Sequence, residues 1–294
     1  MFGHYPRSVK GIRPVAAPLE KAEDLLPIGV VEVSADAVEV AEFAAALGLS
    51  ATPCTAPLTF PIRWLASPAL RGAIQQVGGM TYPVQASQSF LYNAPIVPGR
   101  NYQLQIALRQ GSAHSRRLTV HGALGDGDDR IVLTFESDLY PANALSTATK
   151  PTKQRSGGDS LPELDIGPID ARSVARYAAV ARDDNPLHYD PEFARSVGLE
   201  GPILPGMMMM GLFQRALSEW SESARVVRLA ALFVRPVPVG SRITIGGNIV
   251  LHHNPEIKKH QIVRFFVRTE RDPIVCVGEA SIGSDPSARL APTK

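Results

Sequence analysis

Apolar positions at helical spacing predict two helices in each half of the chain. The first helix of each half follows an aspartate, Asp36 or Asp170, whose carboxylate can accept hydrogen bonds from the first free backbone amides. The second helix of each half is predicted over residues 67–77 and 206–221. Because residues 206–221 are apolar on nearly all sides at their start, this helix is expected to be buried.

Strand-like runs follow the second helix in both halves. They favour β-branched and apolar residues in partial alternation, and turn-forming residues separate them. The predicted strands are residues 101–108, 117–123 and 131–140 in the first half and 242–251, 261–269 and 274–282 in the second. Each half is therefore predicted to be a helix, a long irregular segment, a buried helix and an antiparallel sheet wrapped around that helix. This is an α+β architecture.

The two halves are predicted to be repeats of one domain. The capping residues Asp36 and Asp170 are separated by nearly the same offset as two proline-glycine corners, which end in Gly99 and Gly240. Between the halves, residues 146–164 are small, polar and proline-bearing, a composition typical of a linker. We therefore predict a first repeat over residues 1–145, a linker over 146–164 and a second repeat over 165–294.

Composition and charge exclude several classes of protein. The 294 residues carry 30 Lys+Arg and 28 Asp+Glu, a formal charge of +2, which argues against nucleic acid as a partner. No segment approaches the ~20 apolar residues of a membrane span, and the start of the chain lacks the apolar core of a signal peptide. The two cysteines, Cys54 and Cys276, form no metal spacing and no disulfide framework. We expect a cytoplasmic protein with no membrane contact.

One segment concentrates residues with catalytic chemistry. Residues 183–191 read Asp-Asp-Asn-Pro-Leu-His-Tyr-Asp-Pro and follow a predicted helix. The Asn185-Pro186 dipeptide favours a turn, which can bring the Asp183 carboxylate and the His188 imidazole together as an acid/base pair. Taken alone, the same residues also fit a plain turn with a satisfied loop histidine.

A second feature is a glycine at the predicted start of the buried helix. Residues 202–206 read Pro-Ile-Leu-Pro-Gly, which places Gly206 among unpaired backbone N–H groups at the positive end of the helix dipole. Such a position suits a developing oxyanion, and glycine allows a ligand carbonyl to approach closely. Taken alone, Gly206 is more simply explained as a helix-start glycine.

Together, the two features resemble the signature of the MaoC-like, (R)-specific enoyl-thioester hydratase/dehydratase family. That signature is a helix ending in Tyr, then Ser-Gly-Asp-x-Asn-Pro-Leu-His, then Pro-Ile-Leu-His-Gly opening the central helix of a hot-dog fold. Its counterparts here are residues 177–188 and 201–206. The resemblance covers about residues 165–283 and implies a double hot-dog protein in which only the second repeat keeps the chemistry.

The resemblance also implies roles for individual residues. Asp183 and His188 would be the catalytic pair, Asn185 their positioning partner, and the Gly206 N–H the donor to the thioester carbonyl. Candidate substrate-binding residues are Pro205, Met207 and Met210. In the first half, apolar side chains are candidate walls of the acyl site: Ala66, Leu70, Ile74 and Met80.

Two positions depart from the family signature. Arg182 replaces the glycine before Asp183, where its charge would depress the pKa of the aspartate unless the side chain points to solvent. Pro205 replaces the histidine before Gly206 and removes one backbone donor from the helix start. Neither change removes a group of the implied catalytic pair.

The sequence therefore predicts a hydro-lyase that reversibly hydrates trans-2-enoyl thioesters to (R)-3-hydroxyacyl thioesters, a reaction of fatty acid metabolism. The acyl carrier would be coenzyme A or an acyl-carrier protein, with no further cofactor and no metal, and the family suggests a homodimer. Two alternatives stay open: a hot-dog thioesterase, and a non-catalytic subunit that binds acyl thioesters, which the departures at Arg182 and Pro205 motivate.

Overall fold

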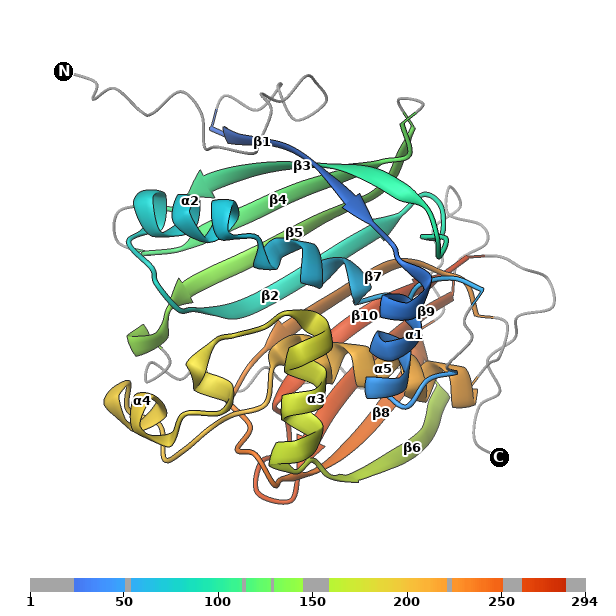
Figure 1. Cartoon of the computed structure of the whole chain (residues 1–294). Coiled ribbons are helices and arrows are strands. Elements are labelled where there is room, and N and C mark those ends of the chain that lie inside the picture. The colour runs from blue at the N-terminus through green and yellow to red at the C-terminus, as the bar shows by residue number, and fades with distance from the viewer. Residues whose placement is uncertain are drawn as a thin grey trace.

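The computed structural model describes residues 24–50, 54–112, 115–127, 130–144, 159–220, 224–250 and 261–283 (Figure 1). Within these residues, ten strands form one antiparallel sheet. The strands of the first half are β1 (Leu26–Ser34), β2 (Pro83–Tyr92), β3 (Asn101–Gln110), β4 (Leu118–Gly125) and β5 (Ile131–Pro141). Those of the second half are β6 (Asp159–Pro168), β7 (Val226–Phe233), β8 (Arg242–Val250), β9 (Gln261–Thr269) and β10 (Cys276–Ile282).

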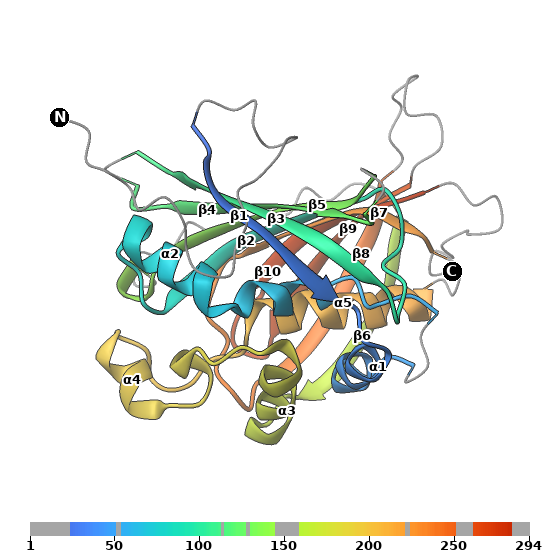
Figure 2. The same cartoon turned by 45° about the horizontal axis from the view of Figure 1, so that its top comes forward.

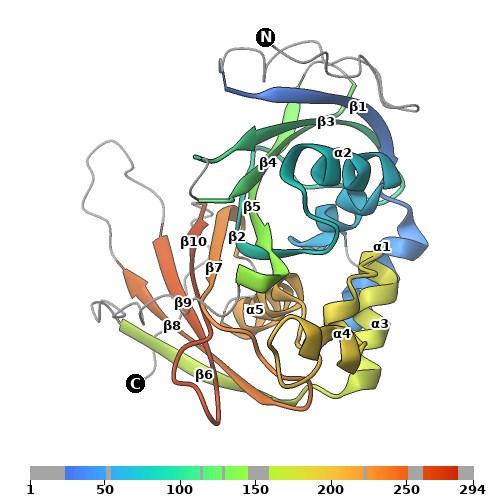
Figure 3. The same ribbon diagram turned by 90° about the vertical axis from the view of Figure 1, so that its left-hand side faces the viewer.

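The two halves of the sheet have the same strand order. The first half runs β1-β3-β4-β5-β2 and the second runs β6-β8-β9-β10-β7, so each strand has a counterpart in the other half. The halves join where β2 pairs with β7, from Ser87 opposite Leu232 to Leu91 opposite Arg228. One continuous sheet therefore crosses the boundary between the repeats (Figure 3).

The linker prediction is wrong in its last part. Residues 146–158 lie outside the described residues, but Asp159–Pro168 form β6, which pairs with β8. β6 is the last strand of the sheet, and most of its side chains are exposed or half-buried. A polar edge strand has much the same composition as a linker, because one of its edges and much of its surface face solvent.

Helices cover one face of the sheet (Figure 2). They are α1 (Ala37–Ala46) and α2 (Pro68–Gly78) in the first half, and α3 (Ala171–Ala181), α4 (Pro191–Ser196) and α5 (Gly206–Trp220) in the second. Short 3₁₀ segments are η2 (Phe60–Ala66), η3 (Ala142–Ala144) and η4 (Pro186–His188). In the part of the chain that the structure describes, no helix is both long and apolar enough to cross a membrane.

The predicted helices and the α+β fold class are confirmed. Asp36 accepts hydrogen bonds from the first-turn amides of α1, and Asp170 accepts one from the Ser173 N–H in α3. The central helix α5 is buried as expected, with Phe213 stacked on Phe265 of β9 at a ring-centroid distance of 3.9 Å. This stacking packs the middle of α5 against the sheet.

Phenylalanine rings lie against glycines of neighbouring strands. Gly278 of β10 is directly opposite Phe265 of β9 in the register. A Cβ atom added to Gly278 would lie 2.2 Å from the Phe265 ring and 2.3 Å from the backbone oxygen of Ala230 in β7. Gly122 of β4 is likewise opposite Phe135 of β5, and a Cβ atom added to it would lie 2.0 Å from that ring. At these positions a side chain would overlap the neighbouring strands, so glycine is required by packing.

Candidate active site

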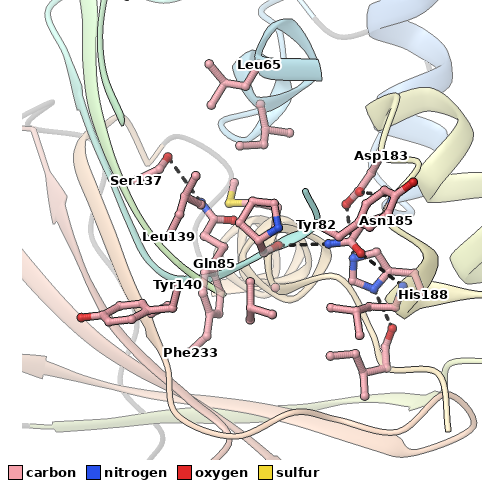
Figure 4. Close-up of a pocket in the computed structure, with 18 of the residues that line it drawn as sticks. Leu65, Tyr82, Gln85, Ser137, Leu139, Tyr140, Asp183, Asn185, His188 and Phe233 are labelled. Carbon is pink, nitrogen blue, oxygen red and sulfur yellow. Dashed lines mark hydrogen bonds and ion pairs between the residues drawn. The ribbon is translucent and has the colours of Figure 1, made fainter. Parts of the chain in front are cut away.

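A cavity of about 500 Å³ is lined by residues of both halves of the chain (Figure 4). This volume lies in the range of small-molecule binding sites, and most of the wall is apolar. The second half contributes the loop after α3, the start of α5 and the end of β7. The first half contributes η2, α2, β2 and β5. Ala66, Leu70 and Ile74 line the cavity as predicted, whereas Met80 does not.

The structure brings the predicted acid/base pair together at this cavity. α3 ends at Ala181, and the following loop carries Asp183 before η4 presents His188. The Nε2 atom of His188 lies 3.4 Å from Oδ2 of Asp183, and both residues line the cavity. The His188 side chain is 9% exposed and that of Asp183 is 33% exposed. The pair is thus largely removed from bulk solvent while its carboxylate remains accessible.

Asn185 holds this loop through three hydrogen bonds. Its backbone N–H donates to Asp183 Oδ1 at 3.2 Å, and its side-chain oxygen accepts from the Leu187 N–H at 3.2 Å. Its side-chain amide donates to the backbone oxygen of Pro83 in β2 at 3.0 Å. The last bond joins the loop of the second half to a strand of the first half, so the position of the pair depends on both repeats.

The hydrogen bond on the far side of the His188 ring determines which nitrogen faces the cavity. Nδ1 lies 2.8 Å from the backbone oxygen of Ile203. Because a carbonyl oxygen can only accept, Nδ1 carries a proton. Nε2 is therefore the nitrogen that faces Asp183 and can exchange a proton.

Each member of the pair favours the charged form of the other. Burial alone would raise the pKa of Asp183, but the hydrogen bond and charge of His188, with the Asn185 N–H, hold it below its usual value. Burial alone would lower the pKa of His188, but the hydrogen bond and charge of Asp183 raise it above its usual value. The two shifts have the same cause, because the carboxylate of Asp183 stabilises the imidazolium form of His188 and the imidazolium stabilises the carboxylate.

An NMR titration of the His188 ring is expected to give a pKa above 6.5, the ordinary value for histidine. In Asp183→Asn that pKa should fall, because burial then acts without the compensating carboxylate. The contribution of His188 to stability is present below 6.5 and is lost as pH rises through its raised pKa. The contribution of Asp183 is present at neutral pH and is lost as pH falls through its lowered pKa. An unchanged titration in Asp183→Asn would contradict the pairing.

Gly206 begins α5 and lines the cavity as predicted. Its N–H is one of the first-turn amides that have no partner within the helix. A Cβ atom at this position would lie 3.1 Å from the ring of Phe233, which also lines the cavity. Glycine is therefore favoured both by the close packing of Phe233 and by the open approach to the helix start.

Only one of the three predicted substrate-binding residues lines the cavity. Met207 lines it, whereas Pro205 and Met210 do not. Met210 is 0% exposed and belongs to the hydrophobic core. It lies about one turn beyond Gly206, and the cavity reaches only the first turn of α5, where Met209 lines it instead.

Arg182 does not have the role that the sequence suggested, and a second arginine, Arg71, lies near Asp183 instead. Arg182 caps α3 in the left-handed conformation, with φ of 56°, and its guanidinium lies 2.8 Å from Glu39 of α1. The cation that helps to lower the pKa of Asp183 is instead Arg71 of α2, which pairs with the neighbouring Asp184. Sequence analysis missed Arg71, and its signal is weak: it is the one charged residue of α2.

Two polar residues on the opposite wall were also missed. Gln85 of β2 and Ser137 of β5 line the cavity away from Asp183 and His188 (Figure 4). Neither belongs to a motif, and β2 itself was not predicted as a strand. The alternation of β5 places Ser137 on the same face as the buried Phe135, which is the available signal for an inward-facing hydroxyl.

Sequence comparisons match part of the chain to known proteins. The family model described as MaoC like domain matches residues 154–265. A mitochondrial 3-hydroxyacyl-[acyl-carrier-protein] dehydratase of Arabidopsis thaliana is 32% identical over 150 residues, which are 50% of this chain and 87% of the relative. An (R)-specific enoyl-CoA hydratase of Aeromonas caviae is 38% identical over 76 residues, 25% of this chain and 57% of the relative.

Solved structures share the fold over nearly the whole chain. A MaoC-like dehydratase has a TM-score of 0.73 at 22% identity and covers 90% of this chain and 98% of its own. A MaoC-like dehydratase from Phytophthora capsici has a TM-score of 0.61 at 18% identity, covering 92% of this chain and 98% of its own. With the match to the Arabidopsis relative, these findings confirm the family and the hot-dog fold: the chain belongs to the MaoC-like family.

Proposed function

We propose that the protein interconverts trans-2-enoyl thioesters and (R)-3-hydroxyacyl thioesters by adding or removing water. The observation that carries the proposal is the ion pair of Asp183 and His188, 3.4 Å apart, on a cavity that also reaches the Gly206 N–H. The names of the relatives from Arabidopsis thaliana and Aeromonas caviae describe the two directions of this reaction. The acyl carrier is proposed to be coenzyme A or an acyl-carrier protein, and no further cofactor is proposed.

In the proposed hydration, the thioester carbonyl accepts a hydrogen bond from the Gly206 N–H. Asp183, which is held ionised, takes a proton from a water molecule as the water oxygen bonds to C3. The electron pair of the C2–C3 double bond moves toward the carbonyl and forms an enolate at the Gly206 N–H. His188, whose pKa is raised by the Asp183 carboxylate, then delivers a proton to C2 as the enolate collapses. Dehydration follows the same steps in reverse.

Each proposed role makes a contribution to the rate whose usual size is known. A positioned acid or base contributes roughly 10²–10⁴-fold, and a backbone oxyanion donor contributes on the order of 10²–10³-fold. The Nδ1 bond to Ile203 and the Asn185 bonds hold both groups before substrate arrives. Such preorganisation lowers the cost of arranging the reacting groups.

A spectroscopic assay separates this function from the alternatives. Purified protein is mixed with trans-2-enoyl-CoA esters of increasing chain length, and the enoyl absorbance and the free thiol are followed together. Loss of absorbance without thiol release supports hydration. Thiol release supports a thioesterase, and binding with neither change supports a non-catalytic subunit.

Replacing Gly206 with Ala is expected to lower kcat/KM for enoyl thioesters by about tenfold, a loss of about 1.4 kcal/mol. The new methyl group would lie 3.1 Å from Phe233 and displace either the ring or the start of α5. Gly72→Ala in α2 is the control, since nothing lies within 4 Å of its added Cβ. The control should keep wild-type kcat/KM and gain about 0.5–1 kcal/mol in stability. Equal activities of the two variants would contradict the role of Gly206.

A further inference from the structure

The cavity has a second polar wall, formed by Gln85, Gln88 and Ser137 of the first half. Gln85 and Ser137 line the cavity, and Gln88 connects them from behind. Gln88 and Ser137 are each 1% exposed, whereas Arg71 beside the catalytic loop has a side chain 40% exposed. The polar wall lies on the side of the cavity opposite Asp183 and His188 in Figure 4.

A β-bulge turns Gln85 toward the cavity. In the pairing of β2 with β5, Gln88 is opposite Ser137, but the register shifts between Gln85 and Ser87. Simple alternation would place Gln85 on the outer face with Ser87. The extra residue instead places it opposite Leu139, which lines the cavity. Bulges commonly re-aim a side chain next to a functional site.

The hydrogen bonds of this wall determine the orientation of each amide group. Gln88 Nε2 donates to the backbone oxygen of Ser89 at 3.0 Å, so Gln88 Oε1 must be an acceptor. It accepts from Gln85 Nε2 at 2.6 Å and from the Ser137 hydroxyl. Gln85 Nε2 also lies 3.4 Å from Ser137 Oγ. Gln85 Oε1 accepts no hydrogen bond from the described residues and is not sealed within the protein.

An acceptor oxygen that faces a mostly apolar cavity selects for a ligand that donates a hydrogen bond. A keto group would place acceptor against acceptor. A carboxylate would lose its hydration, and Gln85, Gln88 and Ser137 supply no positive charge to offset that loss. The simplest neutral donor that an acyl chain can carry at such a place is a hydroxyl group.

We propose that the preferred substrate is a thioester whose acyl chain carries a hydroxyl group, bound by Gln85 Oε1, several carbons beyond the reacting double bond. This inference rests on the proposed function for the placement of the chain. Asn185, next to the catalytic pair, contacts Pro83, and Gln85 lies two residues further along β2. Two residues of a strand span about 7 Å, which places the hydroxyl beyond the reacting carbons.

Binding of saturated acyl-CoA esters tests this proposal independently of turnover, because these chains cannot be hydrated. Chains from octanoyl to tetradecanoyl are compared by calorimetry with matched chains that are hydroxylated at the terminus or at one of the preceding carbons. We expect at least one hydroxylated ester to bind about tenfold more tightly than its matched chain. Gln85→Leu should remove this preference, while Gln76→Leu on the exposed face of α2 should keep it.

Three results would overturn the proposal: no preference at any hydroxyl position, a preference that survives in Gln85→Leu, or an equal loss of affinity for both members of a pair. The last result would mean that Gln85 binds the shared carrier portion. Gln85→Met provides a second substitution if Gln85→Leu does not fold, as judged by thermal unfolding. Failure of the enoyl absorbance assay would count against the proposed reaction, whereas failure here would count against hydroxyl recognition alone.

Discussion

Asp183→Asn and His188→Gln are each expected to cut turnover of enoyl thioesters at least about a hundredfold while the fold survives. The amide of Asn cannot accept a proton from water, and the amide of Gln cannot deliver one to C2. Both replacements keep a polar side chain of similar size, so the packing around the loop should change little. The measurement is kcat from the enoyl absorbance, with thermal unfolding of the same samples.

Asp165→Asn on β6 is the control for charge removal. Asp165 is exposed, forms an ion pair with Arg242 at 2.5 Å and does not line the cavity. Its replacement should leave kcat unchanged, because an exposed ion pair contributes little to stability and this one is remote from the loop. Wild-type turnover in both Asp183→Asn and His188→Gln would remove these residues from the mechanism.

Gly278→Ala is expected to lower the free energy of unfolding by about 3 kcal/mol. The added methyl group would lie 2.3 Å from the backbone oxygen of Ala230, which cannot move without separating β7 from β10. It would also lie 2.2 Å from the ring of Phe265, which is buried and stacked on Phe213. Chemical denaturation of the variant and the wild type gives the difference directly.

Gly125→Ala is the matched control for this substitution, since both glycines lie in strands and neither has a positive φ. The nearest atom to an added Cβ at Gly125 is 3.7 Å away, an ordinary van der Waals contact. Its stability should stay within about 0.5 kcal/mol of the wild type. If both variants lost the same stability, packing against Phe265 would not be the cause.

The sequence predicts elements well where local chemistry determines them. Asp36 and Asp170 mark the starts of α1 and α3, because a capping carboxylate acts within its own helix turn. Four strands were missed. β1 and β6 are the ends of the sheet and are partly solvent-exposed, which weakens their apolar alternation. β2 carries Gln and Ser where a buried strand ordinarily carries apolar residues, and no pattern singled out β7.

In the candidate site too, the contacts between residues close in sequence were predicted and those between distant residues were not. Asp183 and His188 are five positions apart, so a single turn is enough to bring them together, and the sequence pattern contains that turn. Arg71 and Asp184 are 113 positions apart, and their contact exists only after both halves have folded. The inward direction of Gln85 depends on a β-bulge, which shifts one strand against another and has no signature within the strand itself.

The pairing of β2 with β7 has a consequence for how this enzyme can diverge. When two identical subunits associate, every substitution appears twice, once beside each copy of the catalytic loop. Here the wall formed by Gln85 is present once, on the strand β2 that Asn185 of the second half contacts at Pro83. A substitution near Gln85 in the first repeat can therefore alter the proposed recognition of the acyl chain without a matching substitution near Asp183 and His188 in the second repeat.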